Sequence, residues 1–130
     1  MYKSTMAGDI IRIYLFLLIS VLHIPVYAQQ HEISKHSLLI TSKSLANQMG
    51  KIYQLAQNCD QELTSIAATR VAALFRNYFE SKEVTTILKQ YKYAMAEEKG
   101  KSCNYEAIKT HRLMNKIADY MRMAAPFAHR

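Results

Sequence analysis

Apolar residues recur along residues 36–125 at steps of three, four and seven, the spacing that places side chains on one face of an α-helix. The first such face predicts a helix at about 36–58. Its members are Leu38, Leu45, Met49, Ile52, Ala56 and Cys59. Asn58-Cys59-Asp60 interrupts the pattern, and Asp60 is expected to cap the helix that follows.

Three further segments show the same periodicity. The second, at 61–79, carries Leu63, Ile66, Ala67, Val71, Leu74 and Tyr78 on one face, and the third carries Val84, Ile87, Leu88, Tyr91 and Met95. Ser81 is expected to cap the third helix and Gly100 to end it, although the second and third could also form one bent element. The fourth, at 105–124 with Asn104 as its cap, has Ala107, Leu113, Met114, Ile117, Met121 and Ala124 on one side, and Pro126 closes it.

Glycine and proline are too scarce in this region for a many-stranded fold with tight turns. Four helical segments with short links predict an all-α fold, a small antiparallel helical bundle of three to five helices. The expected division is a signal peptide at 1–28, a flexible lead at 29–36, the helical domain at 37–125 and a tail at 126–130. Gly50 inside the first helix can permit a close helix approach, to this chain or to a partner. The tyrosines at 53, 78, 91, 105 and 120 are expected to cover the core with their hydroxyls outward.

The N-terminus has the parts of a secretory signal. Lys3 and Arg12 precede an apolar run at 13–22, and Val26-Tyr27-Ala28 supplies compact residues before the expected cleavage site. The run is shorter than the ~20 apolar residues that cross a bilayer, so an uncleaved anchor is the weaker alternative. We therefore expect an exported protein, periplasmic in a bacterium or otherwise secreted.

Cys59 and Cys103 are the two cysteines of the chain. An even pair in an exported protein predicts a disulfide, with free thiols or a redox pair as alternatives. Closing a loop of roughly 45 residues stabilises a fold by about 4 kcal/mol in the chain-entropy treatment. The predicted bridge would join the first and last helices.

The chain is basic, with 17 Lys and Arg against 10 Asp and Glu and a formal charge of +7. This excess favours anionic partners such as lipid headgroups, acidic polysaccharide or an acidic protein, whereas an exported protein seldom meets nucleic acid. Lys109, Arg112 and Lys116 would form a strip on the fourth helix, and Lys82, Lys89 and Lys92 add charge on the third. The strip is either a binding patch or a solvated flank.

No catalytic residue is predicted. The chain has no G-x-S-x-G turn, H-E-x-x-H pair, phosphate loop or C-x-x-C motif. His111, Met114 and Met121 are candidate ligands for copper(I) or haem, because thioether and imidazole bind both. The two methionines fit the apolar stripe of the fourth helix, so they are expected to fill gaps in the core, and no cofactor is expected.

Residues 45–59 read L-A-x-x-M-G-x-I-Y-x-L-x-x-x-C. This segment resembles the front of a family of small exported alphaproteobacterial proteins in which a Leu-Gly helix ends in Cys, and Cys103 is similar to that family's second cysteine. The chain departs where that family has an aromatic-His-Tyr run, because only Tyr53 stands there. The resemblance implies bacterial export and a disulfide, and no activity.

We therefore expect a non-enzymatic exported binding or adaptor protein, such as an accessory of an envelope or secretion assembly. The alternatives are a metal or haem carrier that uses Met and His, and an inhibitor or immunity protein of an envelope-acting enzyme. The expected partner is another envelope or secreted protein, with weak contact to an anionic membrane surface. The sequence leaves the oligomeric state undetermined.

Overall fold

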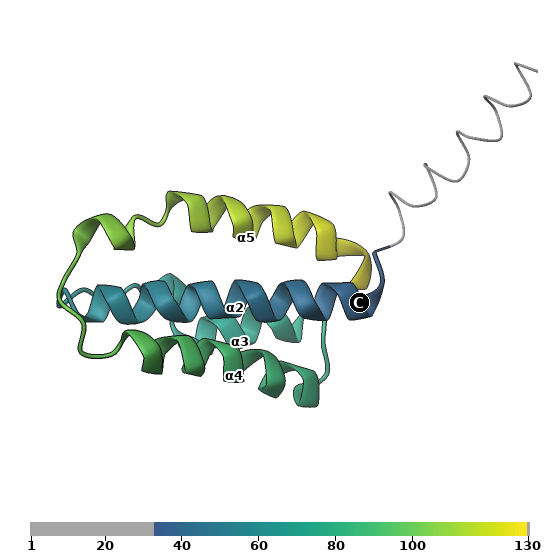
Figure 1. The fold of residues 1–130 in the computed structure, drawn as a ribbon. Helices are drawn as coiled ribbons and strands as arrows, with labels where there is room; N and C mark the ends of the chain where they lie inside the picture. Colours follow the sequence, from purple (N-terminus) through teal and green to yellow (C-terminus); the bar gives the residue numbers. More distant parts are fainter. Residues whose placement is uncertain (1–32, 130) are drawn as a thin grey trace, which may run out of the picture. The chain divides into compact units, whose positions relative to one another are not determined.

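The computed structural model describes residues 33–129, which form an all-α bundle (Figure 1). Its α-helices are α2 (Lys35–Gln57), α3 (Ala68–Arg76), α4 (Ser81–Glu98) and α5 (His111–Ala124). Three short 3₁₀ helices join or follow them: η1 (Thr64–Ile66), η2 (Tyr105–Ile108) and η3 (Ala125–Phe127). No strand occurs between 33 and 129, which confirms the expected fold class. The predicted signal peptide lies outside the described residues.

Helices that follow one another along the chain run antiparallel, so α2 and α4 run parallel. Lys35 pairs with Glu83 near the start of both helices, and the Asn58 side-chain amide donates to the Glu98 carbonyl near their ends. In Figure 1, α5 lies on one side of α2 and α4 on the other, with α3 behind. The long first helix is therefore the centre of the bundle.

Gly50 allows the closest contact in this arrangement. A Cβ atom at this position would lie 2.2 Å from the Tyr91 carbonyl oxygen of α4, far inside van der Waals contact. Glycine lets the two helix backbones meet there because it has no side chain. The sequence did not show whether Gly50 faces this chain or a partner. In the structure it faces α4 of the same chain.

Tyr91 is fully buried, and its hydroxyl donates a 2.7 Å hydrogen bond to the Ile66 carbonyl. Burial raises the pKa of this hydroxyl well above its usual value. The expectation of outward hydroxyls is wrong for Tyr91 and for Tyr120, which is also buried. After Tyr91, the largest fully buried side chains of the described residues are Phe75, Leu38, Met49, Ile66, Ile87 and Val71.

The predicted second helix at 61–79 is broken. Asp60 adopts a left-handed φ of 57° and ends the first segment instead of capping the next one. Ala67 is extended, with ψ 153°, and separates η1 from α3. The Ile66 carbonyl accepts the Tyr91 hydroxyl, so a tertiary hydrogen bond occupies the position where the helix was expected to continue.

The predicted fourth helix is also divided. Asn104 accepts a hydrogen bond from the Glu106 backbone N–H as expected, but it caps only η2. Lys109 is extended with ψ 117°, and α5 begins at His111. The helix is interrupted where Ile108 packs against Leu55. This contact between residues distant in sequence is absent from the helical periodicity.

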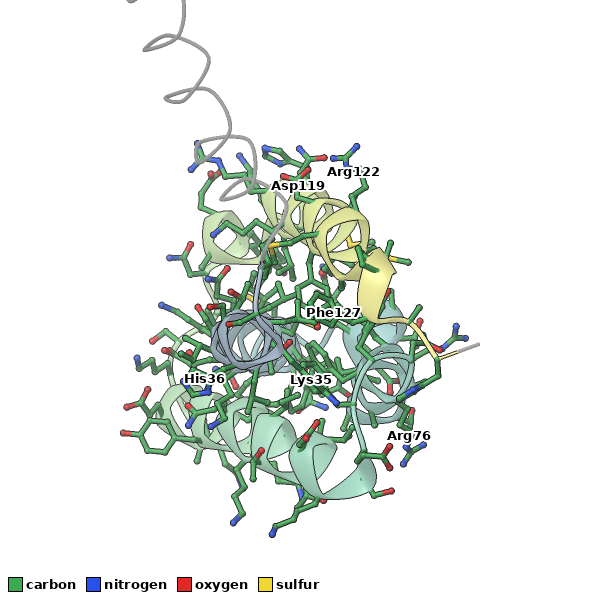
Figure 2. The ribbon with its side chains drawn as sticks, turned by 90° about the vertical axis from the view of Figure 1, so that its right-hand side faces the viewer. Lys35, His36, Arg76, Asp119, Arg122 and Phe127 are labelled. Carbon is green, nitrogen blue, oxygen red and sulfur yellow. A yellow bond between two sulfur atoms is a disulfide. The ribbon has the colours of Figure 1, made fainter. Side chains whose placement is uncertain are left out.

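Both ends of the bundle differ slightly from the expected boundaries. Helix α2 begins at Lys35, inside the predicted lead, and α4 begins at Ser81 with Glu80 as the capping residue. The predicted tail folds back, because the His129 backbone N–H donates to the Asn77 carbonyl at 2.8 Å. Figure 2 shows Phe127 on the inner side of this C-terminal segment.

Cys59 and Cys103 form the predicted disulfide, with their Cα atoms 4.7 Å apart. The bridge joins the residue just beyond α2 to the loop before η2. Cys59 also belongs to a small apolar cluster with Leu55, Ala56 and Ile108. The disulfide therefore holds the segment that leads into α5 against the end of α2.

Candidate functional site

Helix α5 is anchored to the bundle mainly by Tyr120. Its hydroxyl lies 2.6 Å from the Ser42 hydroxyl of α2. Ser42 donates its single proton to the Leu38 carbonyl at 2.7 Å, so Tyr120 is the donor to Ser42. Burial raises the pKa of Tyr120 to about 12, against the lowering effect of the hydrogen bond with Ser42.

The Tyr120 ring also connects α5 to the region of α3. It makes edge contacts with Phe75 and Tyr78, at centroid distances of 5.6 and 5.8 Å. Such perpendicular aromatic pairs are favourable beyond the area that they bury. Leu113 and Ala124 are the other buried residues of α5, so the buried stripe of this helix is narrow.

An apolar groove runs between α3 and α5, with a volume of about 440 Å³. We call it the α3–α5 groove. Arg70 is the charged member of its lining. The lining residues are Met49, Ser65, Ile66, Arg70, Val71, Ala73, Leu74, Asn77, Met114 and Ile117.

Met114 and Met121 lie on the exposed side of α5, with 45% and 46% of their surface accessible. The prediction that they pack in the core is wrong. The apolar residues of α5 cover more of the helix surface than the bundle buries. Only the side that carries Leu113, Tyr120 and Ala124 packs against the other helices. Met114 consequently borders the α3–α5 groove.

The candidate metal ligands remain on the surface of α5. His111 is the first residue of this helix and is exposed, as are Met114 and Met121. Between residues 33 and 129, no group of three or more His, Cys, Asp and Glu side chains lies close enough to hold a metal ion. Within these residues, the structure provides no His, Cys, Asp or Glu cluster beside the three candidate ligands His111, Met114 and Met121.

The predicted basic strip is not continuous on α5. Lys109 precedes the helix and pairs with Glu106 at 2.8 Å. Lys116 donates to the Gln48 side-chain oxygen of α2 at 3.0 Å, and Arg112 is exposed. Only Arg112 and Lys116 share the helix, and the nearby carboxylate of Glu106 reduces the charge at Lys109.

A second cleft, of about 250 Å³, lies between α2 and α5 on the other side of Tyr120. Most of its lining residues carry a polar group, and they include both Lys116 and Asp119. Asp119 in its lining pairs with Arg122, and Figure 2 shows both residues on the outer side of α5. The lining residues are Thr41, Ser44, Leu45, Gln48, Lys116, Asp119, Tyr120 and Met123.

Several residues that build these sites were not singled out by sequence reasoning. Phe75 and Ser42 hold Tyr120, and Arg70 lines the groove. Phe75 follows Val71 by four residues and could have been read as part of the same helical face. Ser42 carried no such signal, because an isolated serine in a helix usually faces solvent or bonds its own backbone.

No protein-family model, curated protein or solved structure matches the chain. None of the helices within residues 33–129 is both long and apolar enough to cross a membrane. The geometry of the bundle is therefore the basis for the proposals that follow.

Proposed function

We propose that this chain is an exported, non-enzymatic binding protein that holds an amphipathic helix of another envelope or secreted protein in the α3–α5 groove. The observation that carries the proposal is the exposure of Met114 in the lining of an apolar groove, with the exposed Met121 two helical turns further along α5. Methionine side chains are flexible and polarisable, and they are frequent on surfaces that adapt to partners.

The shape and charge of the groove support a helical partner. Helices α3 and α5 form its two walls, and an amphipathic helix binds such a groove through apolar residues spaced by three, four and seven positions. Arg70 offers one positive charge within an otherwise uncharged lining. A partner helix with an acidic residue beside its apolar face would complement both features.

The disulfide supports the same proposal. It holds the segment before α5 against the end of α2, and Tyr120 holds the middle of α5. The α5 wall of the groove is thereby positioned before the partner arrives. Preorganisation of this kind lowers the entropy lost on binding.

The test is affinity capture of the tagged chain from native envelope extract, analysed by mass spectrometry with and without reductant. Met114→Glu places a charge at the groove, and Ile40→Glu is the matched control, because Ile40 is 56% exposed on α2. We expect one stoichiometric protein partner with the wild type and Ile40→Glu, and its loss with Met114→Glu or reductant.

A partner retained by Met114→Glu would contradict the groove as the binding site. A preparation that captures no protein but carries colour or metal would instead favour the metal or haem carrier. If the captured partner is an enzyme whose activity falls on binding, the adaptor is an inhibitor or immunity protein. The resemblance of residues 45–59 to exported alphaproteobacterial proteins stays a prediction.

A further inference from the structure

The outer face of α4 carries a row of lysines, Lys82, Lys89 and Lys92, which Lys99 extends just beyond the helix. All four side chains are exposed. Their spacing of seven, three and seven residues places them along one side of the helix. The buried residues of α4 occupy the opposite side: Val84, Ile87, Tyr91, Ala94 and Glu98. We call the four lysines the α4 lysine row.

Within residues 33–129, no carboxylate forms an ion pair with a lysine of this row. None of the four lysines has an Asp or Glu three or four positions away in the sequence. Within residues 33–129, the carboxylates of α4 are engaged elsewhere: Glu83 pairs with Lys35, and Glu98 pairs with Lys101 at 2.7 Å. A hydrogen bond with Glu97 raises the pKa of the Tyr93 hydroxyl.

The row does not help the helix to form. Like charges three or four positions apart, such as Lys89 and Lys92, destabilise a helix slightly, whereas alternating charges would stabilise it. A lysine face that weakens its own helix and lacks pairing partners is suited to an anionic surface outside the molecule.

We propose that the α4 lysine row docks this protein on an anionic lipid surface. The row extends about 25 Å along the helix axis at about 1.5 Å per residue, and its members spread over roughly 100° around the axis. A broad band of lysines along an exposed helix face matches an extended array of phosphates better than it matches a compact ligand. Lysine near an anionic leaflet is attracted by its negative surface potential.

The position of the row fits a membrane contact that leaves the α3–α5 groove open. Helices α4 and α5 lie on opposite sides of α2 in both views (Figures 1 and 2). Near the end of α4, Lys92 and Lys99 also border a cleft with Gln54 and Gln57. The lining also includes the apolar residues Met95 and Ala96, and the two lysines are its charged members.

The proposal separates the lysines of α4 from the basic residues of α5. In the sequence, Lys82, Lys89 and Lys92 of the third segment add to the charge of Lys109, Arg112 and Lys116. In the structure, Lys109 has an acidic partner and Lys116 has a hydrogen-bond partner, whereas the α4 lysine row has no carboxylate partner between residues 33 and 129. The two sets can be tested against each other.

The experiment is co-sedimentation of the protein with vesicles of phosphatidylcholine mixed with phosphatidylglycerol, compared with pure phosphatidylcholine. The test variant is Lys89→Gln with Lys92→Gln. The matched control is Arg112→Gln with Lys116→Gln, which removes the same charge from α5. Each lysine near an anionic leaflet contributes about fivefold to binding, so the α4 variant should bind roughly 25-fold more weakly. The α5 variant should bind much as the wild type does.

Salt should weaken the wild-type interaction, because the Debye length falls from about 10 Å at ~0.1 M to about 3 Å at ~1 M. Equal losses in the two variants would overturn the proposal and indicate attraction by net charge alone. The proposal would also be overturned if the wild type failed to bind the anionic vesicles but bound soluble polyglutamate through these lysines. The partner of the row would then be an acidic protein. Met114→Glu should bind vesicles normally, so this result is independent of the groove.

Discussion

The backbone of α2 at Gly50 touches the backbone of α4 at Tyr91, where a Cβ atom would lie 2.2 Å from the Tyr91 carbonyl oxygen and 2.9 Å from its Cα. The obstructing atoms are main chain and cannot move aside as a flexible side chain would. The fully buried Tyr91 ring holds this part of α4 in place. This contact determines how closely the two parallel helices pack.

Replacing Gly50 by alanine should therefore destabilise the fold. Alanine favours a helix over glycine by about 1 kcal/mol, but overpacking a rigid contact costs about 1–3 kcal/mol and the helices must also separate. We expect a lower urea midpoint for Gly50→Ala, and a still lower one for Gly50→Val. A stabilised alanine variant would show that the helices do not meet at this position.

Removing the disulfide should lower stability by about 4 kcal/mol, or less if the unfolded chain retains structure. The bridge spans a sequence separation of 44 residues, and its loss frees the segment before α5. Thermal unfolding of the wild type with and without reductant measures the effect. Cys59→Ala with Cys103→Ala is the control, because reductant should not alter its melting temperature.

The Ser42–Tyr120 hydrogen bond predicts unequal effects of its two partners. Tyr120→Phe removes a donor and leaves Ser42 bonded to the Leu38 carbonyl, at a cost of about 1 kcal/mol. Ser42→Ala leaves the buried Tyr120 hydroxyl without an acceptor, at a cost of about 1–3 kcal/mol. Denaturant unfolding of both variants and of the double variant gives the coupling. Strict additivity would contradict the bond.

Alkaline pH should unfold the protein partly through Tyr120. Its pKa is raised from 10.0 to about 12 in the folded state, so the unfolded chain ionises first. The stabilisation from this group is complete below pH 10 and is lost as the pH rises to about 12. Urea midpoints across this range should fall less steeply in Tyr120→Phe than in the wild type. Equal slopes would contradict a buried neutral phenol.

The α3–α5 groove makes a further prediction about charge. Because Arg70 is the charged residue of the lining, Arg70→Glu should weaken capture of an acidic partner helix more than Arg70→Gln does. Binding of the captured partner to both variants, measured by titration calorimetry, tests this order. Arg76→Glu on the same helix is the control, because Arg76 does not line the groove. Equal affinities for the two Arg70 variants would place the partner elsewhere.

The sequence alone determined the all-helical class, the disulfide and the approximate span of α2 and α4. Apolar periodicity and helix termini such as Gly100 are local properties, and two cysteines permit only one pairing within the chain. The positive φ of 84° at Gly100 agrees with the predicted end of the third helix. These features depend on neighbours in sequence, so they could be read without coordinates.

Tertiary structure alone decided where the remaining helices break and which faces are buried. The chain leaves the helix at Ala67, where Ile66 meets Tyr91, and at Lys109, beside the packing of Ile108 against Leu55. Periodicity assigned Met114 and Met121 to the core because it records which residues are apolar, not how much of that stripe a neighbour covers. Contacts between residues distant in sequence determine that coverage, and in α5 they leave Met114 and Met121 on the exposed side of the helix.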